Sequence, residues 1–236
     1  MSLLTICQSV LRETGFNNLT AIASSSDENA RRLFGLANRE GKALMKRHDW
    51  TVLQKEHTFS TANGTANYAL PSDFDRFIKV TGWDRTNYWA LQGPITPQEW
   101  QLIKSGITQT GPRRRYRIKP SSQTNYIYLD PTPTTTDSLV FEYISNQFCQ
   151  SSGGTAQSAF AADGDLGIGD FEYLITLGIK WRWLAALGLS YAEERREYDL
   201  ELERAIARDG DQPKLSLNGN RRWLPGANIP ESGFGS

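Results

Sequence analysis

The chain has 236 residues, a length that suits one large domain or two small ones. Its 26 Lys and Arg residues balance 26 Asp and Glu residues, so bulk charge provides no general attraction to nucleic acids or membranes. The two cysteines, Cys7 and Cys149, are far apart, which excludes a zinc motif, gives no indication of a disulfide and suits synthesis in a reducing cytoplasm.

The first fifty residues predict two helices. Apolar side chains recur at three- and four-residue spacing over Ser2–Gly15, where Gly15 is a helix stop. Polar residues interrupt this segment, so it does not resemble a signal peptide. Ser25 and Glu28 have the spacing of a capping box, in which a hydroxyl and a carboxylate satisfy free amides, and they predict a second helix over Ser25–Trp50.

The next hundred residues are rich in predicted strands. Thr51–Thr61 alternates, and Asn63-Gly64 predicts a hairpin turn that leads into a strand over Ala66–Leu70. Further strands are expected over Phe77–Trp83, Tyr116–Lys119, Tyr126–Leu129 and Leu139–Ile144. Thr96-Pro97-Gln98-Glu99 predicts the start of a short helix, because Thr is a good cap and Pro suits the first helical position. Ser151–Gly169 is rich in small residues and is expected to be a loop.

The segment Asp170–Arg208 predicts a single long helix of roughly 58 Å, at 1.5 Å per residue. Its first half is apolar on nearly every side, which indicates packing against neighbouring subunits as well as the home core. The apolar run Trp183–Leu189 is too short to span a bilayer. The candidates for subunit packing are Trp181, Trp183, Leu184, Leu187 and Tyr191.

Residues 210–236 cannot build a core, because glycines and prolines separate a few large side chains. We expect this arm to dock on a partner. Arg and Trp dominate interface hot spots, which favours the following anchors. They are Arg221, Arg222, Trp223, Leu224, Ile229 and Phe234.

These elements predict an α+β fold. A helical bundle body, made of two N-terminal helices and the long C-terminal helix, is expected over residues 1–50 and 170–209. A small antiparallel β module with one short helix is inserted over residues 51–169. The arm over residues 210–236 is expected to be extended.

Residues with catalytic or ligand-binding patterns are scarce. His48 and His57 lie in neither a Ser/His/Asp nor a metal-binding spacing. Asp163–Asp170 weakly resembles a calcium loop, but Leu174 occupies the twelfth position where a bidentate Glu is required. A Gly-rich turn with Asp170 capping the next helix is favoured. The sequence therefore predicts no catalytic residue, no metal site and no cofactor.

One basic run leaves two interpretations open. It contains Arg113, Arg114, Arg115, Arg117 and Lys119. These side chains either face DNA phosphates or line a strand whose charges meet solvent or acids of a neighbouring subunit. The second interpretation is favoured, because such runs are often solvated faces.

Three stretches together resemble the head-to-tail adaptor, or connector, proteins of tailed bacteriophages, especially short-tailed ones. They are the opening helix Ser2–Gly15, the stretch from Trp50 to Leu70-Pro71-Ser72-Asp73-Phe74-Asp75-Arg76, and the stretch from Trp83-Asp84 to Gly93–Trp100. The motif Leu70–Arg76 is the part of this resemblance that is most specific to the family. Taken alone, this segment is typical of a structural element and not of a functional site, with Phe74 and Phe77 filling a core.

The resemblance implies a ring of twelve copies at the head–tail junction of the virion, made in the host cytoplasm. The body would surround the DNA channel, the β module would meet the tail nozzle or next tail component, and the arm would bind the portal protein. Genomic DNA would pass through the channel without sequence-specific binding, and the protein would have no membrane partner. This structural, non-enzymatic function involved in DNA ejection is the favoured hypothesis.

Two alternatives come from the residues themselves. A virion-associated cell-wall hydrolase would need a close carboxylate pair, for which Asp73/Asp75 and Asp163/Asp165 are the candidates. A DNA-binding module would be centred on the basic run Arg113–Lys119.

Overall fold

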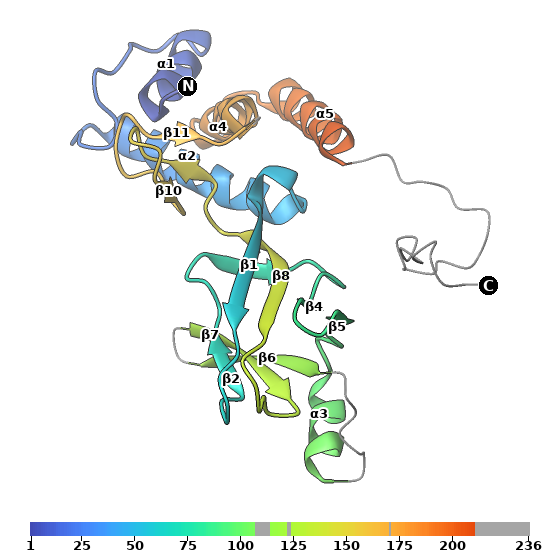
Figure 1. The fold of residues 1–236 in the computed structure, drawn as a ribbon. Helices are drawn as coiled ribbons and strands as arrows, with labels where there is room; N and C mark the ends of the chain where they lie inside the picture. The colour runs from blue at the N-terminus through green and yellow to red at the C-terminus, as the bar shows by residue number, and fades with distance from the viewer. Residues whose placement is uncertain (107–113, 122–123, 170, 211–236) are drawn as a thin grey trace, which may run out of the picture.

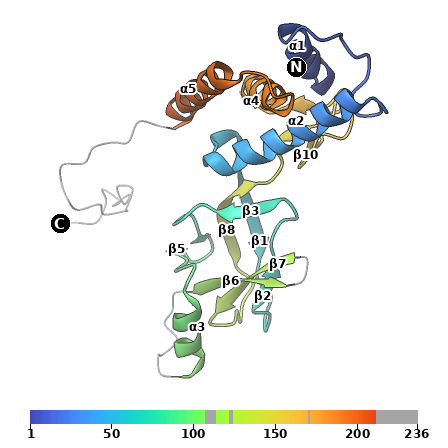
Figure 2. The ribbon, with the colours of Figure 1, turned by 180° about the vertical axis from the view of Figure 1, so that it is seen from behind.

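The computed structural model describes residues 1–106, 114–121, 124–169 and 171–210. Arg113, Asp170 and all six predicted arm anchors lie outside these residues. The described chain is α+β, as the sequence predicts, with helices and small antiparallel sheets. The chain is elongated, with four of the helices at one end and the larger sheets at the other (Figure 1). The view from behind shows the same division (Figure 2).

Four helices share one hydrophobic core: α1 (Leu3–Glu13), α2 (Glu28–Arg47), α4 (Phe171–Ala186) and α5 (Ala192–Asp209). α1 begins as predicted, with the Ser2 hydroxyl accepting a hydrogen bond from the Thr5 amide at 3.3 Å. The predicted start of α2 is wrong, because Asp27 caps this helix by accepting hydrogen bonds from two amides of its first turn. The Ser25 hydroxyl instead accepts from the Asp27 amide at 3.2 Å, so it forms the turn ahead of the helix.

The single helix predicted over Asp170–Arg208 is wrong, because the chain turns between α4 and α5. Gly188 has a φ of 73°, a left-handed conformation that glycine adopts at little cost. The Gly188 amide donates to the Ala185 carbonyl at 3.2 Å, and the Leu189 amide donates to the Leu184 carbonyl at 3.0 Å. These two bonds form a Schellman motif, which ends α4 and lets α5 pack back against it.

A three-stranded antiparallel sheet also packs into the helical core. It consists of β9 (Cys149–Gln150) between β10 (Ala156–Gln157) and β11 (Leu166–Gly167). Phe148, Cys149 and Phe160 are buried among the helices. The segment expected to be a loop therefore contains short strands, and residues 148–167 pack with the helices rather than with the other sheets.

The remaining strands form two antiparallel sheets around a second core. The first sheet has the order β1-β8-β4-β5, with β3 also paired to β8. It contains β1 (Gln54–Ser60), β3 (Phe74–Phe77), β4 (Trp83–Asp84), β5 (Trp89–Ala90) and β8 (Ser138–Ser145). The second sheet contains β2 (Asn67–Ala69), β7 (Thr124–Asp130) and β6 (Arg115–Ser121), in that order.

Two short helical segments flank these sheets. The turn η1 (Thr51–Leu53) leads from α2 into β1, and α3 (Pro97–Lys104) lies at the end of the molecule farthest from the other helices (Figure 1). The predicted start of α3 is confirmed, because Thr96 and Glu99 exchange the two hydrogen bonds of a capping box.

The hairpin predicted across Asn63-Gly64 is wrong. Gly64 does have the positive φ of a tight turn, 77°. However, β1 pairs along its whole length with β8, and β2 pairs with β7. The strand predicted over Phe77–Trp83 is also divided, because Val80 turns the chain between β3 and β4 with a φ of 66°.

The segment Leu70–Arg76 is structural, as its sequence indicates. Phe74 and Phe77 pack against the second core. The Asp73 carboxylate accepts hydrogen bonds from Lys55 at 2.7 Å, Tyr143 at 2.9 Å and Ser145 at 2.8 Å. Burial alone would raise the pKa of Asp73, but these donors outweigh it and lower the pKa. Asp73 therefore ties the start of β3 to β1 and β8.

Candidate interaction surfaces

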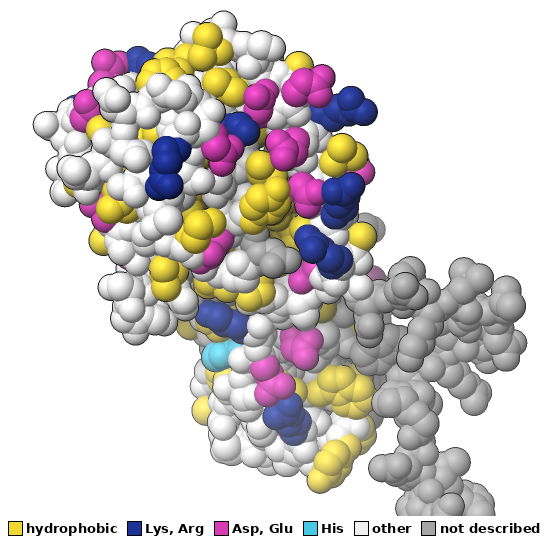
Figure 3. Space-filling model, turned by 90° about the horizontal axis from the view of Figure 1, so that it is seen from above, with side chains coloured by type: hydrophobic (Ala, Val, Ile, Leu, Met, Phe, Trp, Pro, Cys, Tyr) yellow, Lys and Arg dark blue, Asp and Glu magenta, His cyan; other side chains and the backbone are white. Residues whose placement is uncertain are grey.

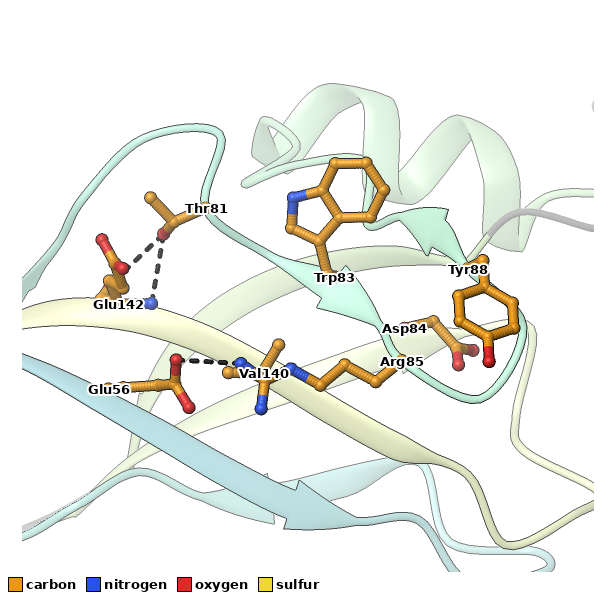
Figure 4. A pocket seen from close by; sticks show the side chains of 8 residues that line it. All are labelled: Glu56, Thr81, Trp83, Asp84, Arg85, Tyr88, Val140 and Glu142. Carbon is orange, nitrogen blue, oxygen red and sulfur yellow. Dashed lines mark hydrogen bonds and ion pairs between the residues drawn. The ribbon is translucent and has the colours of Figure 1, made fainter. Parts of the chain in front are cut away.

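A groove of about 730 Å³ opens on the first sheet of the β module, between β1, β8 and the loop that joins β4 to β5. Figure 4 shows the side chains that line it. They are Glu56, Thr81, Trp83, Asp84, Arg85, Tyr88, Val140 and Glu142. Because they come from three separate parts of the chain, no local sequence pattern indicates this groove.

Large apolar side chains are exposed on the segments next in sequence to the groove residues Thr81 and Tyr88. Val80 is 55% exposed, Tyr88 is 84% exposed and Trp89 is 41% exposed. Val80 and Tyr88 both have left-handed backbones, with φ of 66° and 59°. Such conformations cost about 1–3 kcal/mol in residues other than glycine, and they concentrate at binding sites. Strain and apolar exposure thus coincide at this edge of the sheet.

Asp84 holds the loop beside the groove in place. One of its oxygens accepts hydrogen bonds from the amides of Thr86 and Asn87 at 3.0 and 2.9 Å. The Thr86 hydroxyl in turn accepts from the Ser138 amide of β8 at 2.8 Å. The Arg114 guanidinium also pairs with the other oxygen of the Asp84 carboxylate, at 3.2 Å. The loop is therefore anchored while Tyr88 projects from it.

The groove carries unbalanced negative charge. Glu56 and Glu142 are directly opposite each other on β1 and β8, an arrangement that is unfavourable for like charges. Arg85 compensates one of them, pairing with the Glu56 carboxylate at 2.9 Å. The Glu142 carboxylate has no hydrogen bond or ion pair with another residue in the described ranges.

The basic run separates into two groups. Arg114 is a structural residue, because it is largely buried and pairs with both Asp84 and Asp137. Burial would raise the pKa of Asp137, but hydrogen bonds from Arg114 and Thr135 outweigh it and lower the pKa.

The other three described basic residues project from one face of β6. Arg115, Arg117 and Lys119 alternate with Tyr116 and Ile118, which pack into the second core. Within the described ranges, no carboxylate lies within ion-pair distance of these three cations. This face is therefore basic and partly exposed.

Lys119 lies against aromatic rings at the base of this face. Its ammonium nitrogen is 4.8 Å from the Trp100 ring centroid and 4.6 Å from the Tyr128 ring centroid. Burial lowers the pKa of Lys119, and the nearby charges of Arg117 and Lys104 lower it further. The crowding of cations makes this face suited to a negatively charged partner.

The five residues predicted for subunit packing fall into different environments. Trp183 is fully buried and Leu184 is 8% exposed, so this chain's own core already encloses both. Leu187 is partly buried against the same core. The Trp181 ring packs against Tyr191, with ring centroids 6.2 Å apart, and the Arg182 guanidinium lies 4.4 Å from the Trp181 ring centroid. Of the five, Tyr191 is the most open to a neighbour, at 39% exposed.

The surface of α5 mixes charges of both signs. Figure 3 shows Lys and Arg side chains beside Asp and Glu side chains over this helix. Arg195 pairs loosely with Asp199 at 3.8 Å, and Arg204 pairs with Glu201. Such exposed pairs contribute little to stability, so they remain available for contacts with another surface.

A buried charged cluster joins three helices, and no sequence pattern predicts it. Glu40 of α2 is fully buried. Its carboxylate pairs with Arg182 of α4 at 2.6 Å and accepts a hydrogen bond from the Tyr198 hydroxyl of α5. Burial, together with the Glu40 charge, raises the pKa of Tyr198. Gly178 leaves room for the cluster, because a Cβ there would overlap the Glu40 side chain.

A comparison with protein families gives the identity. Residues 1–223 match a family model described as SU10 adaptor protein. The chain belongs to the SU10 adaptor protein family. No curated protein matches this adaptor. The match spans both hydrophobic cores and supports the resemblance to phage head-to-tail adaptors, a structural class of virion protein that contacts portal and tail components.

The carboxylate pairs considered for a hydrolase have structural contacts in this adaptor. Asp163 accepts hydrogen bonds from the amides of Ile22 and Ala23 at 2.9 and 2.8 Å. Asp165 accepts from two amides of its own loop. Asp75 pairs with Arg76 at 2.6 Å. Each of these carboxylates, like Asp73, therefore has a hydrogen-bond or ion-pair partner within the described residues.

No group of three or more His, Cys, Asp and Glu side chains in the described residues has a geometry that could hold a metal ion. No helix among them has the length and apolar character needed to cross a membrane.

Proposed function

We propose that this adaptor is a ring-forming subunit that joins the portal to the tail of a short-tailed phage and surrounds the path by which DNA leaves. The observation that carries the proposal is the family match across residues 1–223, which includes both cores and the first arm anchors. The copy number of twelve and the position below the portal follow from the resemblance to phage connectors.

Side-by-side packing of subunits would use the α4–α5 surface. Tyr191 and Leu189 are exposed there, at 39% and 48%, beside the half-buried Trp181. Exposed aromatic and aliphatic side chains beside mixed charges are typical of interfaces that form only on assembly. Trp183 and Leu184 would support that surface from beneath rather than touch a neighbour.

The arm would dock on the portal. Burying Trp223, Leu224, Ile229 and Phe234 offers a gross gain of about 6–12 kcal/mol, at 1.5–3 kcal/mol for each side chain. Ordering all 27 residues from 210 to 236 would cost about 27 kcal/mol or more, at about 1 kcal/mol for each residue, which exceeds this gain, so docking is expected to order only short stretches around the anchors. Affinity per copy is then modest, and attachment depends on many arms acting together.

The deciding experiment compares the mass of the free protein with its copy number in purified particles. We expect a monomer in solution and a closed ring of about twelve copies between portal and tail in the particle, because rings that closed in solution would compete with ordered assembly. A particle holding one or two copies, or copies placed away from the portal, would refute the proposal.

The arm is tested separately by ending the chain at Gly210. Both cores lie before this residue, so we expect the thermal unfolding midpoint to change little while attachment to portal-bearing heads falls. Full attachment of the shortened chain would refute the portal-binding function of the arm.

A DNA contact at the β6 face is the second candidate function. Arg115, Arg117 and Lys119 support it, since these cations share one face without carboxylate partners in the described ranges. If DNA binds there, the Arg117→Gln/Lys119→Gln variant lowers the slope of log affinity against log salt by about 0.9 for each phosphate that the variant no longer neutralises. An unchanged slope would favour the alternative, in which this face meets acids of a neighbouring subunit.

A further inference from the structure

The groove on the first sheet of the β module has properties of a docking site for a basic and aromatic segment. It combines the unpaired carboxylate of Glu142 with the exposed ring of Tyr88 and the half-buried ring of Trp83. An arriving guanidinium would relieve the repulsion between Glu56 and Glu142 across β1 and β8. It would also be attracted to the faces of the two aromatic rings.

The chain itself contains a segment with this chemistry. Arg221-Arg222-Trp223-Leu224 places two adjacent guanidinium groups before a large aromatic and an aliphatic side chain. One of these arginines can pair with Glu142, which has no partner in the described ranges, while the other adds positive charge beside Glu56, which Arg85 already pairs. The groove volume of about 730 Å³ lies in the range that holds several side chains.

The arm also begins close enough to reach the groove of its own chain. Thr51 fixes the end of α5, because its amide and hydroxyl both donate to Asp209 at 2.9 Å. Glu56 lies five residues beyond Thr51, so at most about 18 Å of chain separates them. Arg221 lies eleven residues beyond Gly210, which gives the arm a reach of up to about 36 Å. The end of α5 and the β4–β5 edge lie on the same side of the molecule (Figures 1 and 2).

We propose that in the free adaptor the segment Arg221–Leu224 docks into the groove lined by Glu56, Glu142, Trp83 and Tyr88 of its own chain. Arg222 pairs with Glu142, Arg221 lies beside the Arg85–Glu56 pair, and Trp223 packs beside Tyr88. A short tether gives the arm a millimolar effective concentration at the groove, so even a weak contact is populated in a dilute subunit. The docked arm keeps its apolar anchors from pairing free subunits before assembly.

Cysteine crosslinking in the full-length chain tests this contact without any portal protein. One variant combines Asn87→Cys, an exposed position next to Tyr88 at the groove edge, with Leu224→Cys in the arm. The matched control combines Val52→Cys with Leu224→Cys. Val52 is 44% exposed and adjoins Thr51, so an undocked arm would meet this position at least as often as the groove. The native Cys7 and Cys149 are fully buried and do not compete.

The rate of disulfide formation and the mass of the product are the measurements. We expect the Asn87→Cys pair to close within one chain at least about tenfold faster than the control pair, because docking raises the local thiol concentration above that of a free tether. Adding Glu142→Gln or Arg222→Gln to the first pair should slow it towards the control rate. Adding Glu193→Gln, which removes an exposed acid on α5, should not change it.

Three results would overturn the proposal. They are equal rates for the two pairs, a product that is mainly a covalent dimer, and a rate that does not respond to Glu142→Gln and Arg222→Gln. A dimer would instead place the arm on a second copy. Failure of this contact leaves the proposed ring and portal attachment untouched, since those are measured in assembled particles.

Discussion

Replacing Arg182 by Met should strongly destabilise the helical end of the molecule. Arg182 is the only basic side chain in the described residues that pairs with the fully buried Glu40 carboxylate. Without it, a buried charge remains with a hydroxyl donor but no counterion. Removing one partner of a buried ion pair costs about 3–5 kcal/mol. For a chain of this size, that loss lowers Tm by roughly 6–20 °C.

The same cluster provides the compensating change. Glu40→Gln removes the buried charge, keeps the side-chain shape and leaves an oxygen that accepts the Tyr198 hydrogen bond. In the Arg182→Met background it should therefore recover stability, with a coupling energy of about 1–3 kcal/mol between the two sites. The measurement is a double-mutant cycle from urea unfolding, followed by far-UV circular dichroism.

Lys180→Met is the matched control. Lys180 lies on the same helix and pairs with Glu13 of α1 at 2.9 Å, but the Glu13 side chain is 45% exposed. Removing this pair should cost no more than about 1 kcal/mol. If Arg182→Met cost no more than Lys180→Met, or if Glu40→Gln gave no recovery, the buried cluster would not fix α2, α4 and α5 together.

Two further predictions concern the turn after α4 and the loss of folding stability at acid pH. Gly188→Ala should destabilise the chain by about 1 kcal/mol, because the φ of 73° is unfavourable for alanine. Gly35→Ala within α2 is the control and should stabilise the chain by up to about 1 kcal/mol. Equal effects of the two substitutions on thermal unfolding would contradict the Schellman turn. The lowered pKa of Asp73 means that its bonds contribute stability above the ordinary carboxyl pKa, and that this contribution disappears as pH falls through the lower folded value. The difference in unfolding free energy between wild type and Asp73→Asn should therefore be largest near pH 7 and shrink towards pH 2, and a constant difference would show that Asp73 does not titrate in this way.

Elements with strong local signals were predictable. The helix expected over Ser2–Gly15 is observed as α1 over Leu3–Glu13, and the predicted Thr96–Glu99 capping box starts α3, because helical spacing and capping depend on residues that are close in sequence. The strands β6, β7 and β8 were predicted within a few residues, since alternation reports burial on one face. The most specific part of the family resemblance was also a local sequence motif, Leu70–Arg76.

Local signals failed where a distant contact decided the outcome. Asn63-Gly64 is a good hairpin turn, yet β1 pairs over its whole length with the distant strand β8, from Gln54–Ile144 to Ser60–Ser138. The end of α4 at Gly188 was not predictable, because apolar and then charged residues continue a helical pattern across it. A single glycine is tolerated in many helices, so only its left-handed conformation identifies the turn.

The sequence by itself determined the α+β class, the family of the chain and the composition of the arm, because each depends on residues that are close together along the chain. Only the tertiary structure decided which of the predicted residues are available for contacts. It buried Trp183, paired Arg114 with two acids and left Arg115, Arg117 and Lys119 on one face. It also brought Glu56, Tyr88 and Glu142 together in one groove, since strand pairing joins segments that have no relation in sequence.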